Sequence, residues 1–396
     1  MPVPTEFAPS PEVASAAVSP AVPAIPFARS ARGTVGLEWE LTLVDPVTGA
    51  PVSRAPEVLA ALAAPDGTPH SFITGELLLN TVELVSDVHT TVPAAIDDLR
   101  GQLDELRVVC DSLGIDLIAS GSHPFAQWQD QPITPKPRYE KLIDRTRWWG
   151  RNMMIWGVHV HVGVEDAERA LPLLDGLLTY SPHLQALSAS SPFWAGVDTG
   201  YASNRSLMFQ QLPTAGIPQQ FTHWSEFEAY VADMTRTGII EDHSEVRWDL
   251  RPSPRWGTIE LRSCDAASTL TEFGAIAALA HCLSDVLTTR LDAGEELTVL
   301  QPWFVRENKW RAARYGLEAE LIINAEGDER LVTDHLRELV TDLAPVAERL
   351  GCAAELASIP GILDAGGSYQ RQLQVAAEND GDLRAVVANL AAELRG

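Results

Sequence analysis

Four segments that lie far apart in the chain share one alternation of apolar and polar residues. They span residues 35–44, 80–85, 156–162 and 258–265. Successive side chains of a β-strand point to opposite sides of a sheet, so each segment predicts a strand with one apolar and one polar face. Antiparallel sheets accommodate such strands because helices need to cover only one face. The pattern therefore predicts a largely antiparallel sheet with an open polar side.

The polar faces of these four segments carry acids, imidazoles and a guanidinium. The residues are Glu38 and Glu40, Glu83 with Glu76 just upstream, His159 and His161, and Glu260 with Arg262. Taken singly, each pair has an ordinary interpretation. A Glu-x-Glu strand is typical of a solvated sheet edge, and an exposed Glu–Arg pair stabilises by only about 0–1 kcal/mol. The recurrence of this chemistry on four strands predicts one shared basin.

The donor atoms of this basin indicate a hard divalent cation. Candidate ligands are Glu38, Glu40, Glu76, Glu83, His159 and Glu260. Carboxylate oxygens with one or two imidazoles suit Mg²⁺ or Mn²⁺ better than zinc, which favours thiolates.

A cluster of arginines precedes and enters the last strand. It consists of Arg247, Arg251, Arg255 and Arg262. If residues 247–251 form a strand, Arg247, Asp249 and Arg251 share a face, and residues 252–254 turn the chain back as a hairpin. Guanidinium groups bind phosphate or carboxylate in a planar, forked geometry. Arginines beside divalent cations favour phosphoryl transfer, although the same arginines could simply pair with the carboxylates.

The motifs together resemble the type-2 glutamate–cysteine ligase family of bacterial carboxylate–amine ligases. The matching segments are residues 36–40, 76–85, 119–124, 157–163, 247–255 and 257–265, and the resemblance extends from about residue 34 to 367. It implies an α+β fold like that of glutamine synthetase, with a curved, mainly antiparallel sheet, helices on the convex face and the active site on the concave face. It further implies ATP and Mg²⁺ (or Mn²⁺) as cofactors, and glutamate with cysteine or another amine as substrates. The expected reaction forms γ-glutamylcysteine through a γ-glutamyl phosphate and releases ADP and phosphate.

Carried over by position, the resemblance assigns the six candidate ligands to metal binding and four residues to catalysis. The catalytic candidates are His161, Arg251, Arg255 and Arg262, and the nucleotide-binding candidates are Arg247, Arg251, Arg262, Asn308 and Arg314. Asn308, Arg311 and Arg314 fall in a helical stretch that could equally be a solvated face. The chain departs from the family pattern at Trp39, where a glutamate is common, and at residues 364–371, so Gln370 and Arg371 receive no role.

The organisation along the chain predicts two parts. Residues 1–30 are rich in Pro, Ala and Ser and are expected to form a disordered arm, and residues 31–396 a single catalytic domain. Apolar periodicity predicts helices over residues 96–113, 171–187 and 270–291, a strand over 115–119, and a mostly helical last third from Trp303.

Composition narrows the possible partners. A formal net charge of −25 disfavours binding to nucleic acid or to an anionic membrane, because phosphate groups repel such a surface. The sequence shows no apolar run of about 18 residues, so no membrane-spanning helix is expected. The four cysteines (Cys110, Cys264, Cys282 and Cys352) show no metal or disulfide spacing. Cys264 falls on the site-facing side of its strand but is interpreted as a small buried residue. These features suit a cytoplasmic enzyme, and the resemblance is compatible with a homodimer.

The chain has no Walker-type or Gly-x-Gly-x-x-Gly loop, so ATP would be held by metals and arginines. Two other functions use the same basin. A metal-dependent hydrolase could activate a water against an amide or ester. A non-enzymatic protein could bind a carboxylate or nucleotide there without turnover.

Overall fold

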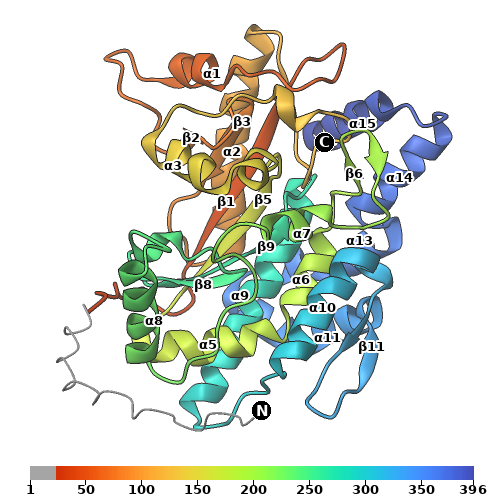
Figure 1. Cartoon of the computed structure of the whole chain (residues 1–396). Helices are drawn as coiled ribbons and strands as arrows, with labels where there is room; N and C mark the ends of the chain where they lie inside the picture. The colour runs from red at the N-terminus through yellow and green to blue at the C-terminus, as the bar shows by residue number, and fades with distance from the viewer. Residues whose placement is uncertain (1–23) are drawn as a thin grey trace, which may run out of the picture.

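The computed structural model describes residues 24–396, and a seven-stranded antiparallel sheet runs through its centre (Figure 1). The strand order is β2-β3-β1-β5-β9-β8, and β4 pairs with the far end of β1. The strands are β1 (Val35–Val44), β2 (Ile73–Gly75), β3 (Thr81–Val85), β4 (Asp116–Ile118), β5 (Gly157–Gly163), β8 (Leu250–Ser253) and β9 (Thr258–Asp265). The four alternating segments and the strand predicted over 115–119 are thus confirmed. Two small hairpins join β6 (Phe193–Trp194) to β7 (Val197–Asp198), and β10 (Glu320–Ile322) to β11 (Glu329–Leu331).

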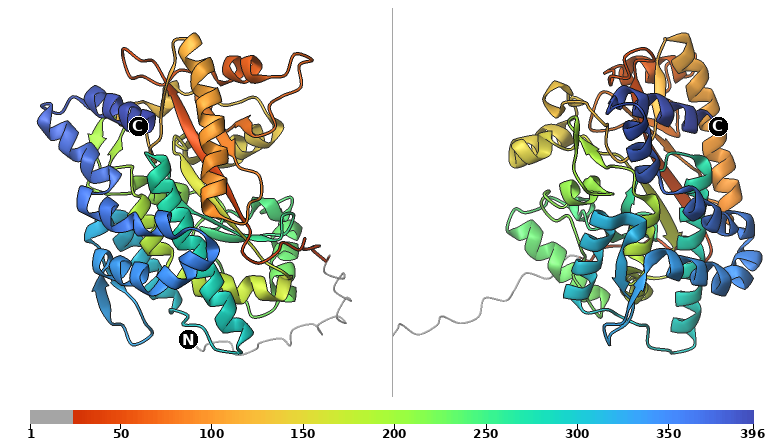
Figure 2. Two further views of the ribbon diagram at one scale, coloured as in Figure 1. Left: turned by 180° about the vertical axis from the view of Figure 1, so that it is seen from behind. Right: turned by 90° about the vertical axis from the view of Figure 1, so that its right-hand side faces the viewer.

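Two long helices cover the apolar face of the sheet. Seen from behind, α2 (Val92–Ser112) and α9 (Leu270–Asp292) lie across the strands (Figure 2). Trp39 of β1 is fully buried beneath them: its ring contacts that of Phe273 with centroids 5.9 Å apart, and its indole N–H donates to the carbonyl of Ala267. The α+β class, with helices behind an antiparallel sheet, is therefore confirmed. The concave shape of the opposite face stays a prediction.

The remaining helices surround this core, and the last third of the chain is mostly helical, as predicted. They are α1 (Ala55–Leu62), α3 (Pro137–Thr146), α4 (Trp148–Arg151), α5 (Ala167–Leu178), α6 (Ser181–Ser188), α7 (Asn204–Phe209), α8 (Trp224–Arg236), α10 (Pro302–Tyr315), α11 (Val332–Leu350), α12 (Ala353–Ala357), α13 (Ile359–Ala365), α14 (Ser368–Glu378) and α15 (Leu383–Arg395). The helix predicted over 171–187 is in fact two, α5 and α6. The break comes just before Pro182, which has no N–H to donate and restricts the residue before it.

A β-bulge in β9 corrects the expected orientation of Cys264. The register between β5 and β9 shifts so that Val160 faces Leu261 while Val158 faces Cys264. One extra residue in β9 reverses the side to which later side chains point. Cys264 therefore joins the buried core beside Val158 and does not face the polar side. Its interpretation as a small buried residue is confirmed.

The predicted hairpin exists, but it begins and turns later than expected. Pro252 and Ser253 belong to β8, where they face Ile259 and Thr258, so residues 254–257 make the turn. Pro252 fits here because β8 is an edge strand, so the N–H that proline lacks is not needed for hydrogen bonds to a further strand. Residues 247–249 precede the strand. Asp249 turns into the core and pairs with Lys309 at 2.6 Å, so it does not share a face with the arginines.

The amino-terminal arm was predicted to be disordered up to residue 30, and this is wrong for residues 24–30. The backbone N–H of Ile25 donates to Glu228, the ring of Phe27 packs edge-on against Trp224, and the N–H of Ala28 donates to the carbonyl of Pro254. Ile25 and Phe27 also pack against the hydrophobic core, so these contacts hold the segment against α8 and the β8–β9 turn. Residues 1–23 lie outside the described part of the chain.

Helix α9 differs from the expectation that no segment is long and apolar enough to span a membrane. By length and composition α9 could cross a membrane, but 83% of its most apolar stretch is buried in the protein, which is typical of a central core helix.

All four cysteines are free and buried, in agreement with the absence of disulfide spacing. Cys282 of α9 and Cys352 are nevertheless neighbours, with their sulfur atoms 3.6 Å apart, a pairing that their separation in sequence conceals.

Candidate active site

The register of the three central strands aligns the predicted metal ligands side by side. Strand β1 lies between β3 and β5, so that Glu40 faces Glu83 on one side and Glu38 faces His159 on the other. Trp39, which stands between the two glutamates, points into the core, so the departure from the family pattern leaves the polar face intact.

The same polar row continues across β9 to the edge strand. His161 of β5 faces Glu260 of β9, and Glu260 faces Arg251 of β8. Acids, imidazoles and guanidiniums from distant parts of the sequence therefore meet on one side of one sheet, as predicted.

These side chains line a cavity of about 800 Å³. Of the predicted site residues it contains Glu38, Glu40, Glu76, Glu83, His159, His161, Arg247, Arg251, Glu260 and Arg262. Helices α3 and α7 and the segment before β8 contribute the opposing walls.

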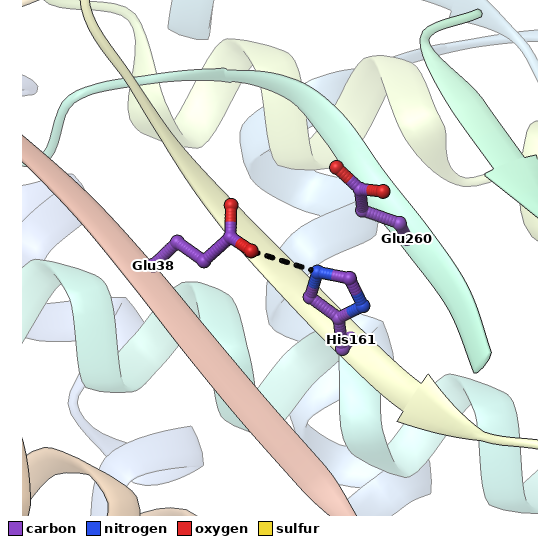
Figure 3. A group of neighbouring side chains, drawn as sticks. All are labelled: Glu38, His161 and Glu260. Atoms are coloured by element: carbon purple, nitrogen blue, oxygen red, sulfur yellow. Dashed lines mark hydrogen bonds and ion pairs between the residues drawn. The ribbon is translucent and has the colours of Figure 1, made fainter. Parts of the chain in front are cut away.

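Glu38 is the centre of the site. Its two carboxylate oxygens contact different imidazoles: one lies 2.5 Å from Nδ1 of His159 and the other 3.2 Å from Nε2 of His161 (Figure 3 shows the second contact). Two groups of potential ligands share it, Glu38 with Glu83 and His159, and Glu38 with His161 and Glu260. In each group the ligand atoms lie within 4.8 Å of one another. Either group could hold a divalent cation, and the oxygen-rich donor set fits Mg²⁺ or Mn²⁺.

The carboxylates at the β1–β3 end lack sufficient counter-charge. Burial, followed by the nearby charge of Glu76, raises the pKa of Glu40 to about 7. The pKa of Glu83 is raised well above its usual value by burial and by the charges of Glu76, Glu38 and Glu40. Like charges held this close favour protonation unless a cation lies between them. A cation bound at this end of the site would therefore balance the charges of Glu40 and Glu83.

At the β9 end the charges are balanced. Burial raises the pKa of Glu260, but the adjacent guanidiniums of Arg262 and Arg251 outweigh it and hold that pKa well below its usual range. Arg251 donates to Glu260 at 2.7 Å, and Arg262 forms a second ion pair with it. The alternative interpretation, that the arginines pair with carboxylates, is thus partly correct, although both remain on the cavity wall.

The pKa values of the two histidines shift in opposite directions. Burial, and next the charge of Arg262, lowers the pKa of His159 to about 4, so this imidazole is neutral at physiological pH and can ligate a metal. Burial also lowers the pKa of His161, but the charges of Glu260 and Glu38 outweigh it and leave the pKa raised. The two ring nitrogens of His161 contact the hydroxyl of Thr258 and a carboxylate oxygen of Glu38.

Three predicted site residues lie elsewhere. Arg255 sits in the exposed β8–β9 turn and stacks on Trp256, with its guanidinium carbon 4.7 Å from the ring centre. Both amide atoms of Asn308 bond the backbone of Ile322, at 2.7 and 2.8 Å, so this side chain has a structural role. Arg314 donates to the carbonyl of Gly200.

These positions give no support to the nucleotide contacts predicted for Asn308 and Arg314 or to the phosphate contact predicted for Arg255, and all three stay predictions. None of these side chains lines the cavity. For Asn308 and Arg314 the physical reason is that the polar face of α10 bonds to other parts of the fold, as in the ion pair of Arg311 with Glu329 of β11. Arg371, which received no role, likewise pairs with Glu272 and Glu393 outside the site.

The sequence reasoning missed the basic wall that faces the acids. Helix α3 places Arg138, Lys141 and Arg145 along the cavity. Their spacing of three and four residues puts them on one helical face, a signal that could have been recognised. The neighbouring Tyr139 donates to Glu76 at 3.0 Å. Arg205 of α7 also lines the cavity, and no sequence pattern marks it.

Comparison with known proteins agrees with this architecture. The profile described as "Glutamate-cysteine ligase family 2" matches residues 34–389. A protein named "Putative glutamate--cysteine ligase 2" from Leifsonia xyli subsp. xyli is 62% identical over 93% of this chain and 98% of its own length. One of the same name from Clavibacter michiganensis subsp. michiganensis is 56% identical over 94% and 97%.

Two solved structures share the fold at low sequence identity. A bifunctional glutathione synthetase from Pasteurella multocida superposes with a TM-score of 0.65 at 17% identity, over 91% of this chain and 52% of that one. A glutamate–cysteine ligase from Francisella tularensis, in complex with AMP, gives a TM-score of 0.56 at 16% identity, over 93% of both chains. On the family match and the identity to its relatives, the chain belongs to glutamate–cysteine ligase family 2.

Proposed function

We propose that the protein is an ATP-dependent carboxylate–amine ligase that joins the γ-carboxylate of glutamate to the amine of cysteine. The observation that carries the proposal is the shared cavity. Two overlapping sets of cation ligands meet at Glu38, with Arg251 and Arg262 beside them on the same sheet face. Membership of the glutamate–cysteine ligase family supports the choice of substrates.

The first proposed step is transfer of the terminal phosphoryl group of ATP to the glutamate γ-carboxylate. A carboxylate oxygen forms a bond to the γ-phosphorus as the bond to ADP breaks, and negative charge builds on the equatorial oxygens. Mg²⁺ held by the Glu38 sets would supply charge neutralisation at the phosphates. Arg262 would then donate hydrogen bonds to the moving phosphoryl group, with His161 beside it. Removal of one such contact typically costs about 2.7–4 kcal/mol in the barrier.

The second step completes the amide. The amine of cysteine attacks the acyl carbon, phosphate leaves with the electrons of the C–O bond, and the amine loses a proton. No side chain of the protein acts as a nucleophile, which agrees with the core position of Cys264.

We further infer that residues 31–396 act as one catalytic unit in the cytoplasm, where ATP and reduced cysteine are available. A large hydrophobic core cluster with members from Val35 to Leu394, beside a smaller one that includes Ile118 and Leu390, supports the unit.

The decisive experiment measures ADP release with ATP, Mg²⁺ and glutamate, with and without cysteine or a panel of other amines, followed by mass spectrometry of the product. We expect ADP and γ-glutamylcysteine in equal amounts only when all substrates are present. Cleavage of amides or esters without any need for ATP would instead identify the metal-dependent hydrolase.

A further inference from the structure

Arg205 is a buried guanidinium that lacks a carboxylate partner in the described part of the chain. It belongs to α7, is only 4% exposed and lines the cavity. Its two terminal nitrogens reach one protein acceptor, the carbonyl of Arg262, at long distances of 3.3 and 3.4 Å. Its Nε is buried and has no hydrogen-bond partner in residues 24–396.

Of the five other arginines that line the cavity, four pair with a carboxylate and the fifth is exposed. Arg251 and Arg262 pair with Glu260, Arg247 with Glu245, and Arg138 with Glu76. Arg145, the remaining arginine of the wall, donates to the carbonyl of Ile239.

The two carboxylates whose titration Arg205 influences are already engaged. Glu40 accepts from the backbone N–H of Gly157 at 2.6 Å. Asp265 accepts from the N–H of Ser190 and from the hydroxyls of Ser191 and Ser203, at 2.7 to 2.9 Å. A charge removed from water without a partner is costly, so a buried cation of this kind indicates an anion that arrives with a ligand.

Packing and hydrogen bonds hold this guanidinium in a defined position. Arg205 lies flat against Gly157, the first residue of β5, where a Cβ atom would come within 2.2 Å of one terminal nitrogen and 2.7 Å of the guanidinium carbon. The backbone N–H of Arg205 donates to Ser191, and Ser203, the residue that caps α7, donates to Asp265. Asp265 thereby fixes the short helix that carries Arg205.

A second guanidinium stands beside it. The ring of Phe209 lies 5.8 Å from the guanidinium carbon of Arg205 and 6.0 Å from that of Arg262. The Nε of Arg262 is also buried without a partner in the described residues. Two guanidiniums that share one aromatic ring, next to a carboxylate-lined cation site, form a recognition site for a group with several anionic oxygens.

We propose that Arg205 is a substrate-binding residue which, with Arg262, holds an anionic group of a substrate, either a phosphate or a carboxylate. This assignment deepens the proposed ligase function and rests on it for the identity of the substrates. The requirement for an anion follows from the burial of Arg205 and from its lack of a carboxylate partner in the described residues. It does not depend on which reaction is catalysed.

The test compares Arg205→Met and Arg205→Lys with a control, Arg107→Met, which replaces a half-buried arginine outside the cavity that also donates to a backbone carbonyl, that of Leu394. Calorimetry with Mg²⁺ present measures the binding of inorganic phosphate, of a non-hydrolysable ATP analogue and of glutamate. Arg205→Met should weaken at least one of these at least tenfold, and Arg205→Lys should recover only part of it because lysine lacks the planar fork. The control should bind like the wild type.

Kinetics and binding together separate the two sources of the anion. If Arg205 holds the substrate carboxylate, glutamate binding and its KM weaken while those of ATP stay constant. If it holds the transferred phosphate, kcat falls by about 10²–10³ and phosphate binding is lost while glutamate binding persists.

A thermal-unfolding measurement tests whether Arg205 has a purely structural role. Without ligand, Arg205→Met should unfold close to the wild-type temperature, because the loss of an unpaired buried charge offsets the loss of its attraction for Glu40 and Asp265. Phosphate or glutamate should raise the melting temperature of the wild type but not that of the variant. A variant that binds all three ligands within twofold of the wild type, or that is markedly less stable without ligand, overturns the proposal. Absence of ligase turnover in the wild type would refute the proposed function alone. The binding measurements would still show whether Arg205 binds an anion.

Discussion

The crowded carboxylates at the β1–β3 end lead to a prediction in which one substitution stabilises the protein and removes its function. The substitution is Glu40→Gln, which keeps the shape of the side chain and an oxygen able to accept from the N–H of Gly157. Burial and the charge of Glu76 raise the pKa of Glu40 from 4.5 to about 7. Each pKa unit corresponds to about 1.4 kcal/mol, so ionisation of Glu40 in the folded protein costs at most about 3.4 kcal/mol.

The sign of the pH dependence follows from proton linkage. Because the folded pKa lies above the unfolded one, the folded state binds more protons between pH 4.5 and about 7. The contribution of Glu40 to the free energy of unfolding is therefore most favourable below pH 4.5 and is lost as the pH rises through 7. Partial contact with solvent reduces the magnitude, so at pH 8 without divalent cations we expect Glu40→Gln to be more stable by about 1–3 kcal/mol.

Urea unfolding at pH 5 and pH 8, in EDTA and in Mg²⁺, measures this effect. In EDTA the variant should gain stability at pH 8 and differ little at pH 5. Mg²⁺ should stabilise the wild type by mass action and the variant much less, and ligase turnover should be lost. A variant that is less stable than the wild type in EDTA at pH 8 would refute the reasoning, because it would show that Glu40 serves a structural ion pair with the nearby arginines.

Three further substitutions test other parts of the structure. Glu260→Gln should abolish turnover and also lower the free energy of unfolding by about 3–5 kcal/mol, because it leaves two guanidiniums without their buried partner; unchanged urea unfolding would contradict this. The imidazoles of His183 and His335 contact each other at 2.9 Å, and burial lowers both pKa values, that of His183 to about 3. Stability should therefore fall below pH 6.5 by up to about 1.4 kcal/mol per pH unit for each histidine, and His183→Gln should flatten that slope; an equally steep slope in the variant would exclude the pair as its origin. Asn308→Ala should cost about 1–3 kcal/mol of stability through the lost bonds to Ile322 and leave the KM for ATP unchanged; a raised KM with normal stability would support its predicted role in nucleotide binding.

Side-chain alternation was sufficient to predict the metal-binding face. Glu38, Glu83 and His159 could be assigned to it because the side-chain period of a strand is two, so a local pattern already separates the core face from the open face. The same reasoning placed Trp39 in the core, where the structure has it.

The tertiary structure decided everything that depends on contacts between distant segments. The bulge in β9 sends Cys264 to the core, which strict alternation cannot anticipate because one inserted residue reverses all later positions. The periodicity of α10 shows which of its faces is polar, but not that Asn308 and Arg314 serve neighbouring backbone groups there. Arg205 reaches the site only because Asp265 anchors its short helix over Gly157. Local sequence determines which side of an element a residue occupies, whereas strand register and helix docking determine what that side meets, since these arise from the packing of the whole chain.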